Sequence, residues 1–302
     1  MARTTATPRY AIVEAPSVLG LKPTGVDGLA AALPRHGLAD RLGARIAARL
    51  TPPPYDPGRP RDTGTLNADG IARLSSTLAD AVGDVVAAGD RPFVLGGDCS
   101  ILLGSLLAFR RRGRYGLLFV DGHADFYQPE ANPNGEAASM DLAFATGRGP
   151  AVLADLEGRG PLVRDEDVVA FAFRDDEEQR QYGSQPLAPG IHALDLATVR
   201  RKGIAAAAAD AMRHLARRDL DGFFLHVDAD VLDDAIMPAV DYRLPGGLSA
   251  VELRHVLRAA AASGRLAGLE VAIYNPALDR DGSAGRLLAD ALVDGLTLSR
   301  RA

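Results

Sequence analysis

Three clusters of polar residues each follow a short apolar run, and they contain the residue types that bind metal ions. The clusters are Gly96-Gly97-Asp98-Cys99-Ser100, Asp121-Gly122-His123-Ala124-Asp125 and Asp228-Ala229-Asp230. In an open parallel sheet, ligands gather where strands end and loops begin. The sequence therefore predicts a common binding site for the three clusters, with the two glycines before Cys99 allowing a sharp backbone turn.

The spacing inside the clusters favours convergence on one or more cations. Residues at i, i+2 and i+4 of an extended segment point to one face, so Asp121, His123 and Asp125 can meet, as can Asp228 and Asp230. Carboxylates that converge without a cation repel one another strongly, and a divalent metal removes that conflict.

The predicted ligands are imidazole, carboxylate and one possible thiolate, a set that suits Mn²⁺, Co²⁺, Ni²⁺ or Zn²⁺. Two ions roughly 3.5 to 4 Å apart could share Asp121 and Asp228 as bridges. Water between them would be acidified toward hydroxide, which is a nucleophile for an amidine or amide carbon. We expect Asp125, His123 and Asp228 to serve catalysis as well as metal binding.

Each motif also has a structural interpretation. A single D-x-H-x-D can serve capping and hydrogen bonding, but a second D-x-D after another buried strand favours metal. Cys99, the only cysteine, could be a small buried hydrophobe, although its place after Gly96-Gly97-Asp98 favours a ligand. His226 precedes Asp228 by two and could join the site, but a histidine hydrogen-bonded behind the ligands is the favoured interpretation.

The elements that must position these residues alternate along the chain. Strands are expected at 10–13, 93–95, 116–120, 168–173, 222–227 and 269–273, and helices at 67–88, 196–217 and 249–262. Asn67 marks one helix start, and Ser249 with Glu252 forms a capping-box pattern. Residues 51–64 and 125–138 are expected to be loops. The alternation predicts an α/β fold with an open, mostly parallel sheet covered by helices on both faces.

Composition narrows the function further. The chain has 302 residues, of which 47% are hydrophobic and 24% charged, with net charge −5 and an isoelectric point near 5.7. This charge gives no general attraction to nucleic acid or anionic membrane, so a small polar substrate fits better. The apolar runs are shorter than the about 20 residues of a membrane span, and residues 1–10 lack a signal-like stretch. We expect one catalytic domain over residues 1–302, located in the cytoplasm.

The motifs together resemble those of the ureohydrolases, the family of arginase, agmatinase and formiminoglutamase. Residues 96–100 resemble the family's G-G-D-H-S, residues 121–125 its D-A-H-x-D, and residues 228–233 its D-[VI]-D-x-[LV]-D. Weaker similarity at residues 25–38, at Pro238, at residues 246–249 and at Asn275-Pro276 extends the resemblance over nearly the whole chain.

The resemblance implies an arginase-like three-layer α/β/α fold around an eight-stranded parallel sheet, a homo-oligomer (trimer or hexamer) and a binuclear manganese site. By position, Cys99, Asp121, Asp125 and Asp228 would hold one ion. The other would be held by Asp121, His123, Asp228 and Asp230.

Three departures from the family pattern concern function. Cys99 stands where most members have histidine, as in the hydroxyarginine-hydrolysing branch. Ile273 occupies the place of the glutamate that pairs with the guanidinium in arginases and agmatinases, and a buried guanidinium without a carboxylate is costly. The proton-shuttling histidine after the second block is also absent, and Glu136 and Asp141 lie in the segment where a substitute would have to be found.

The leading hypothesis is therefore a metal-dependent hydrolase of a C–N bond, other than a peptide bond, in a guanidino, amidino or formimino compound other than arginine. A deacetylase-like metal amidohydrolase is one alternative. The other is a family member that binds metal without catalysis, which the missing glutamate and histidine favour and the complete set of carboxylates disfavours.

Overall fold

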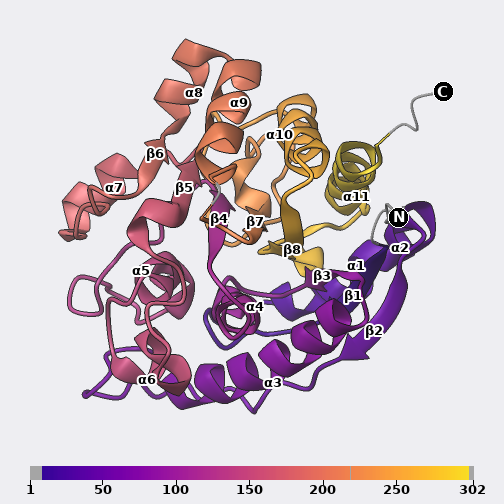
Figure 1. Cartoon of the computed structure of the whole chain (residues 1–302). Helices are drawn as coiled ribbons and strands as arrows, with labels where there is room; N and C mark the ends of the chain where they lie inside the picture. The colour runs from indigo at the N-terminus through magenta and orange to yellow at the C-terminus, as the bar shows by residue number, and fades with distance from the viewer. Residues whose placement is uncertain (1–8, 218, 299–302) are drawn as a thin grey trace.

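The computed structural model describes residues 9–217 and 219–298, and its centre is one eight-stranded sheet (Figure 1). The strands are β1 (Tyr10–Glu14), β2 (Arg45–Arg49), β3 (Arg91–Leu95), β4 (Tyr115–Val120), β5 (Val168–Phe171), β6 (His192–Leu194), β7 (Gly222–Asp228) and β8 (Leu266–Ala272). They pair in the order β2-β1-β3-β8-β7-β4-β5-β6, and every pairing in this sheet is parallel. All strands therefore end at the same edge, where the three polar clusters lie.

Helices cover both faces of this sheet. The helices are α1 (Leu29–Arg35), α2 (Leu38–Leu42), α3 (Ala68–Ala87), α4 (Ile101–Arg110), α5 (Asp141–Ala145), α6 (Ala151–Ala154), α7 (Asp176–Tyr182), α8 (Leu196–Lys202), α9 (Ile204–Leu215), α10 (Ala250–Ala262) and α11 (Ser283–Leu296). Figure 1 shows α3 and α4 on one side of the strands and α9, α10 and α11 on the other. The predicted three-layer α/β/α class is confirmed.

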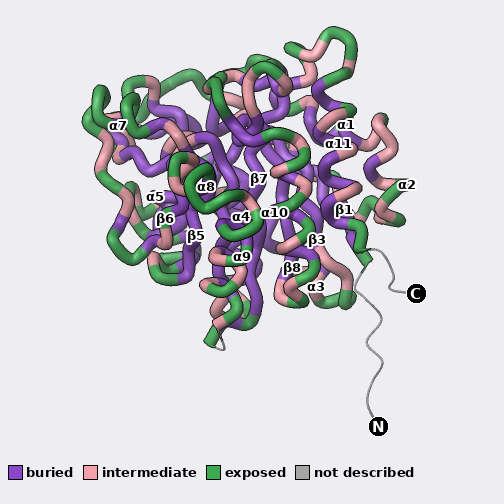
Figure 2. Tube along the Cα trace, turned by 90° about the horizontal axis from the view of Figure 1, so that it is seen from above, coloured by how far each residue is buried: buried purple, intermediate pink, exposed green. Residues whose placement is uncertain are grey.

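The core consists of two apolar layers, one on each side of the sheet. Alternate residues of a strand point to opposite faces, and β4 illustrates this division because Leu118 and Val120 belong to one layer and Leu117 and Phe119 to the other. The central strands are buried along almost their whole length, as the purple segments in Figure 2 show. This double covering explains why the central strands are continuous apolar runs in the sequence.

Several local predictions are confirmed and others need correction. The capping box is present, because Ser249 accepts from the amide of Glu252 while Glu252 accepts from the amide of Ser249. The helix expected over 196–217 is instead two helices, because Gly203 has φ of 78° and interrupts it. Asn67 precedes α3 but does not cap it with its side chain, which instead accepts from the amide of Asp56.

Candidate metal centre

The turn after β3 brings Cys99 to the edge of the sheet. Gly97 is required there, since a Cβ on it would lie 1.7 Å from the carbonyl oxygen of Ser17. Asp98 stabilises the turn by accepting hydrogen bonds from the Ser17 hydroxyl (2.7 Å) and the Ser100 amide (2.8 Å). The Cys99 side chain is consequently buried, with its Sγ 3.0 Å from Oδ2 of Asp228.

The segment after β4 presents three side chains to the cluster, but it is not the extended segment that the i, i+2, i+4 spacing assumed. Asp121 is buried, and its Oδ1 accepts from the amide of His123 at 2.7 Å. Asp125 has φ of 46°, a left-handed conformation that is uncommon outside glycine and concentrates at functional sites.

The segment after β7 completes the cluster. Oδ1 of Asp228 accepts from the amide of Asp230 at 2.7 Å, and Oδ1 of Asp230 accepts from the amide of Gly122 at 3.0 Å. Nδ1 of His123 lies 2.9 Å from Oδ2 of Asp230. The ends of β4 and β7, which are adjacent strands, are thus joined directly.

The electrostatics of this cluster without metal are those of crowded anions. Burial and then the charge of Asp121 raise the pKa of Asp125 far above its usual range, and burial and then Asp230 do the same to Asp228. Burial opposes the charged form of His123, but the neighbouring Asp230 outweighs it and raises the pKa of His123 to about 10. The surrounding side chains therefore supply too little positive charge to balance the buried carboxylates.

Divalent cations fit this donor set. Donor atoms lie within 4.8 Å of one another in three groups, namely Cys99, Asp121, His226 and Asp228; Cys99, Asp125 and Asp141; and Asp121, His123 and Asp230. Among the described side chains, Oδ2 of Asp121 and Nε2 of His226 are buried without a hydrogen-bond partner. Unpartnered buried donors and acceptors are costly, and coordination of a cation would satisfy them.

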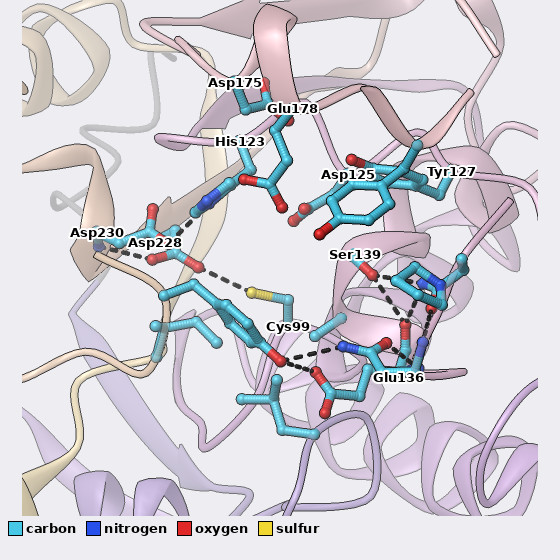
Figure 3. Close-up of a pocket in the computed structure, with 18 residues that line it drawn as sticks. Cys99, His123, Asp125, Tyr127, Glu136, Ser139, Asp175, Glu178, Asp228 and Asp230 are labelled. Atoms are coloured by element: carbon cyan, nitrogen blue, oxygen red, sulfur yellow. Dashed lines mark hydrogen bonds and ion pairs between the residues drawn. The ribbon is translucent and has the colours of Figure 1, made fainter. Parts of the chain in front are cut away.

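A pocket opens onto this cluster (Figure 3). In Figure 3, Cys99, Asp228, Asp230 and His123 lie on one side of it, with Asp125 and Tyr127 opposite and Glu136 below. Its lining includes five of the six predicted ligands, while Asp121 lies behind them at the end of β4. The sequence-predicted site residues are therefore brought together.

Sequence reasoning missed several residues of this site. Asp175 and Glu178 line the pocket, and Asp175 accepts from the amide of Ala124 at 3.1 Å. They belong to a polar cluster that follows β5, so the rule that found the other clusters would have found this one. Asp141, which the sequence offered only as a substitute for the absent histidine, is fully buried with both carboxylate oxygens unpartnered among the described residues, and it groups with the donors of Cys99 and Asp125.

The structure also locates the departures from the family pattern. Ile273 lines the pocket at the end of β8 with φ of 71°, which is strained for a β-branched residue. Glu136 lines the pocket as well, where the Tyr242 hydroxyl donates to its Oε2 at 2.6 Å. Asp141, in contrast, lies deeper, within reach of Cys99 and Asp125.

Comparisons of the sequence with known proteins all identify arginases as relatives. Residues 50–298 match the sequence profile described as the Arginase family. The arginase of Staphylococcus aureus (strain COL) is 29% identical over 282 residues, which cover 89% of this chain and 90% of the relative. The arginase of Bacillus caldovelox is 31% identical over 220 residues, which cover 72% of each.

Solved structures agree with these sequence matches. The native arginase of Bacillus caldovelox superposes with a TM-score of 0.87 at 25% identity, covering 98% of this chain and all of the other. The agmatine ureohydrolase of Thermoplasma volcanium shares the fold, with a TM-score of 0.70 at 17% identity, and the match covers 96% of this chain and 90% of that one.

The parallel α/β fold, the buried donor groups at its strand ends and the match to the family profile together define a metal hydrolase. The chain belongs to the arginase family, which implies a site for two divalent metal ions. No helix in the described part of the chain is both long and apolar enough to cross a membrane.

Proposed function

We propose that this protein hydrolyses a C–N bond of a guanidino, amidino or formimino compound, with two divalent metal ions bound at the candidate centre. The observation that carries the proposal is the convergence of buried acids from β4 and β7, next to Cys99, at the base of one pocket. When bound, the ions supply Lewis-acid activation of water for attack on the substrate carbon.

The proposed ligands follow the family pattern. Cys99, Asp121, Asp125 and Asp228 would hold one ion, and Asp121, His123, Asp228 and Asp230 the other, with Mn²⁺ as the proposed metal. The grouping of Asp121, His123 and Asp230 supports the second set, and the grouping of Cys99 with Asp121 and Asp228 supports the first. Near the reacting carbon, His123, Asp125 and Asp228 are the residues we propose to position substrate and water.

The pocket favours a substrate that carries a positive charge. Beyond the proposed ligands, its acidic lining consists of Glu136, Asp175 and Glu178, and no described lining residue is lysine or arginine. Tyr127, Tyr182 and Tyr242 add aromatic rings, which also attract cations. A substrate amine would find acidic partners here, and it would share Glu136 with the exposed Lys22, whose Nζ lies 3.7 Å from Oε1 of Glu136.

Arginine itself is not the substrate we propose, although the relatives above are named arginases. Ile273 presents an apolar side chain to the pocket where the family pattern has a glutamate for the guanidinium. A free guanidinium placed there would lose water without gaining a carboxylate. A compound whose reacting group is less polar than a guanidinium, and whose cation lies near Glu136 and Glu178, fits this lining better.

The test is a substrate panel with a metal measurement. Protein loaded with Mn²⁺ is assayed for urea, ammonia and amide products with arginine, agmatine, hydroxyarginine and formimino compounds, and Asp228→Asn serves as the inactive control. We expect two ions per chain and turnover of a cationic substrate other than arginine. Two ions without turnover of any compound would favour a non-catalytic metal-binding protein, and absence of bound metal would contradict the proposal.

The resemblance further leads us to propose a trimer or hexamer in the cytoplasm. Light scattering of the purified protein measures the oligomer directly. Fractionation of the source cells tests the location.

A further inference from the structure

His226 occupies a position behind the donor groups that the family resemblance does not assign. It lies on β7 two residues before Asp228, so both side chains point to the same face of the sheet. The side chain is fully buried, and its ring stacks on that of Phe119, its partner on β4, with centroids 4.6 Å apart. Nε2 has no hydrogen-bond partner among the described residues and lies 3.6 Å from Oδ2 of Asp121, which also lacks one.

The other ring nitrogen of His226 is firmly held. Nδ1 lies 2.7 Å from Oε1 of Glu270, its partner in the register of β7 with β8. The Ser105 hydroxyl donates to Oε2 of Glu270 at 2.6 Å, so both carboxylate oxygens are engaged. With its proton on Nδ1, the ring presents the Nε2 lone pair toward Asp121. A carboxylate that accepts from one ring nitrogen while the other faces a donor cluster is the usual arrangement of a metal-ligating histidine.

A structural role for His226 would leave its free nitrogen unexplained. A neutral ring would bury an unused acceptor, and a protonated ring would have only a 3.6 Å ion-pair contact with Asp121, which is too long for a hydrogen bond. Coordination by a cation satisfies both Nε2 and the unpartnered oxygen of Asp121. The four donor atoms that would surround such a cation, from Cys99, Asp121, His226 and Asp228, lie within 4.8 Å of one another.

We propose that Nε2 of His226 is a direct ligand of the ion shared by Cys99, Asp121 and Asp228. The imidazole that most relatives supply from the position of Cys99 would thus come from β7 instead, and the thiolate would be an additional soft donor. Glu270 and Ser105 act as positioning residues that hold the ring. This inference rests on the metal binding in the proposed function and is independent of the substrate.

The direct test is nitrogen NMR of protein labelled with ¹⁵N-histidine, before and after loading with Zn²⁺, which is diamagnetic. The chain has six histidines, and the variants His123→Gln and His226→Phe assign the signals of the two candidates. We expect both to acquire a metal-bound nitrogen, with Nδ1 of His226 remaining protonated. Phenylalanine keeps an aromatic ring beside Phe119 but leaves Oε1 of buried Glu270 without its partner, so the double variant His226→Phe/Glu270→Gln is the control for the fold.

Calorimetric titration with Mn²⁺ gives a second readout. His226→Phe should weaken the binding of one ion by more than roughly 100-fold, beyond the 10- to 100-fold typical of residues that only hold a ligand. Glu270→Gln should fall within that smaller range and retain two ions. The matched control is His255→Gln, because His255 is exposed on α10, and it should leave both affinities unchanged.

The outcomes separate the two proposals. If Zn²⁺ shifts the signal of His123 but not that of His226, or if His226→Phe binds two ions as tightly as the unmodified chain, the ligand assignment is wrong while the proposed function stands. If no histidine nitrogen responds and no metal binds, both fail together.

Discussion

The amide of Ile273 donates a 2.7 Å hydrogen bond to the carbonyl of Gly97, which ties the end of β8 to the turn that carries Cys99. This bond accompanies the strained backbone of Ile273, whose φ is 71°. From this position the side chain of Ile273 lines the pocket.

Ile273→Glu should accordingly place a carboxylate in the pocket without rearranging the loop. We expect hydrolysis of arginine or agmatine to rise by at least about tenfold, equivalent to about 1.4 kcal/mol of transition-state stabilisation. Initial rates of urea release measure this change, with Ile273→Gln as the uncharged control. Equal rates in the two variants would show that the position does not select guanidinium groups.

Cys99 provides a second prediction, because a thiol must lose its proton to bind metal. Burial, then Asp228, raises the pKa of Cys99 well above its usual value in the metal-free protein. Metal affinity should therefore increase with pH, and bound metal should block alkylation. Cys99→His should retain two ions with less preference for soft metals, and Cys99→Ser should weaken one ion.

Titration calorimetry and thermal unfolding of both Cys99 variants distinguish this role from simple packing. If Cys99 only fills space, serine would cost roughly 1 to 3 kcal/mol of folding free energy and leave the metal stoichiometry unchanged. A Cys99→Ser protein that binds two ions with unaltered affinity would remove the thiol from the site.

Asp228 and Asp230 should differ in their effect on metal binding. Asp228 is proposed as a bridge together with Asp121. Asp121 belongs to both donor groups, whereas Asp228 groups with Cys99 and His226, and Asp230 groups with His123. Asp228→Ala should abolish binding of both ions, and Asp230→Ala should weaken mainly one. Titration with Mn²⁺ separates the cases, and equal losses from the two changes would rule out the bridge.

The metal-free protein should become less stable as pH rises from about 6.5 to 10. The pKa of His123 is about 10 in the folded chain and near 6.5 in an unfolded one, so its stabilisation is complete below 6.5 and is lost through this window. The raised pKa values of Asp125 and Asp228 also lower the stability of the metal-free protein as the pH rises above the usual carboxyl range.

Thermal unfolding with a chelator at pH 6, 8 and 10 measures this trend. Added Mn²⁺ should reduce the decline, because the ions replace protons as the source of positive charge. An unfolding temperature that increases between pH 6 and 10 without metal would be inconsistent with the crowded acids described here.

Glu136 should contribute to recognition of a cationic substrate. Glu136→Gln removes its charge and keeps an oxygen for the Tyr242 hydroxyl, so KM for a cationic substrate should rise about tenfold, or about 1.4 kcal/mol, with a small change in kcat. Glu130→Gln is the matched control, since Glu130 is exposed in the same loop and outside the pocket. Equal KM values for the two variants would exclude Glu136 from binding.

The central part of the fold was predictable because its strands are uninterrupted apolar runs followed by polar clusters. The edge strands were not. β2 contains Arg45, two alanines and Arg49, which have weak strand preference, and β6 has only three residues. The sheet order explains this difference, since an edge strand pairs on one side only and needs less burial.

The sequence predicted which residues form the site better than it predicted the contacts between them. The period of two residues singled out Asp121, His123 and Asp125, but the left-handed turn at Asp125 groups its donor atom with those of Cys99 and Asp141. The role of His226 depends instead on its register with Glu270 and on which ring nitrogen is engaged. Neither is visible in one sequence, because both depend on the pairing of strands that are more than 40 residues apart.

The order of the strands has a consequence for when metal can be captured. Cys99 and Asp228 are separated by 129 residues, and β8, formed later still, lies between their strands. A ribosome-bound chain that ends before β7 contains the acids of β4 without their partners, and contacts over such separations form late in folding. Metal binding therefore indicates that the chain has completed folding, and we expect truncated chains to bind no ions.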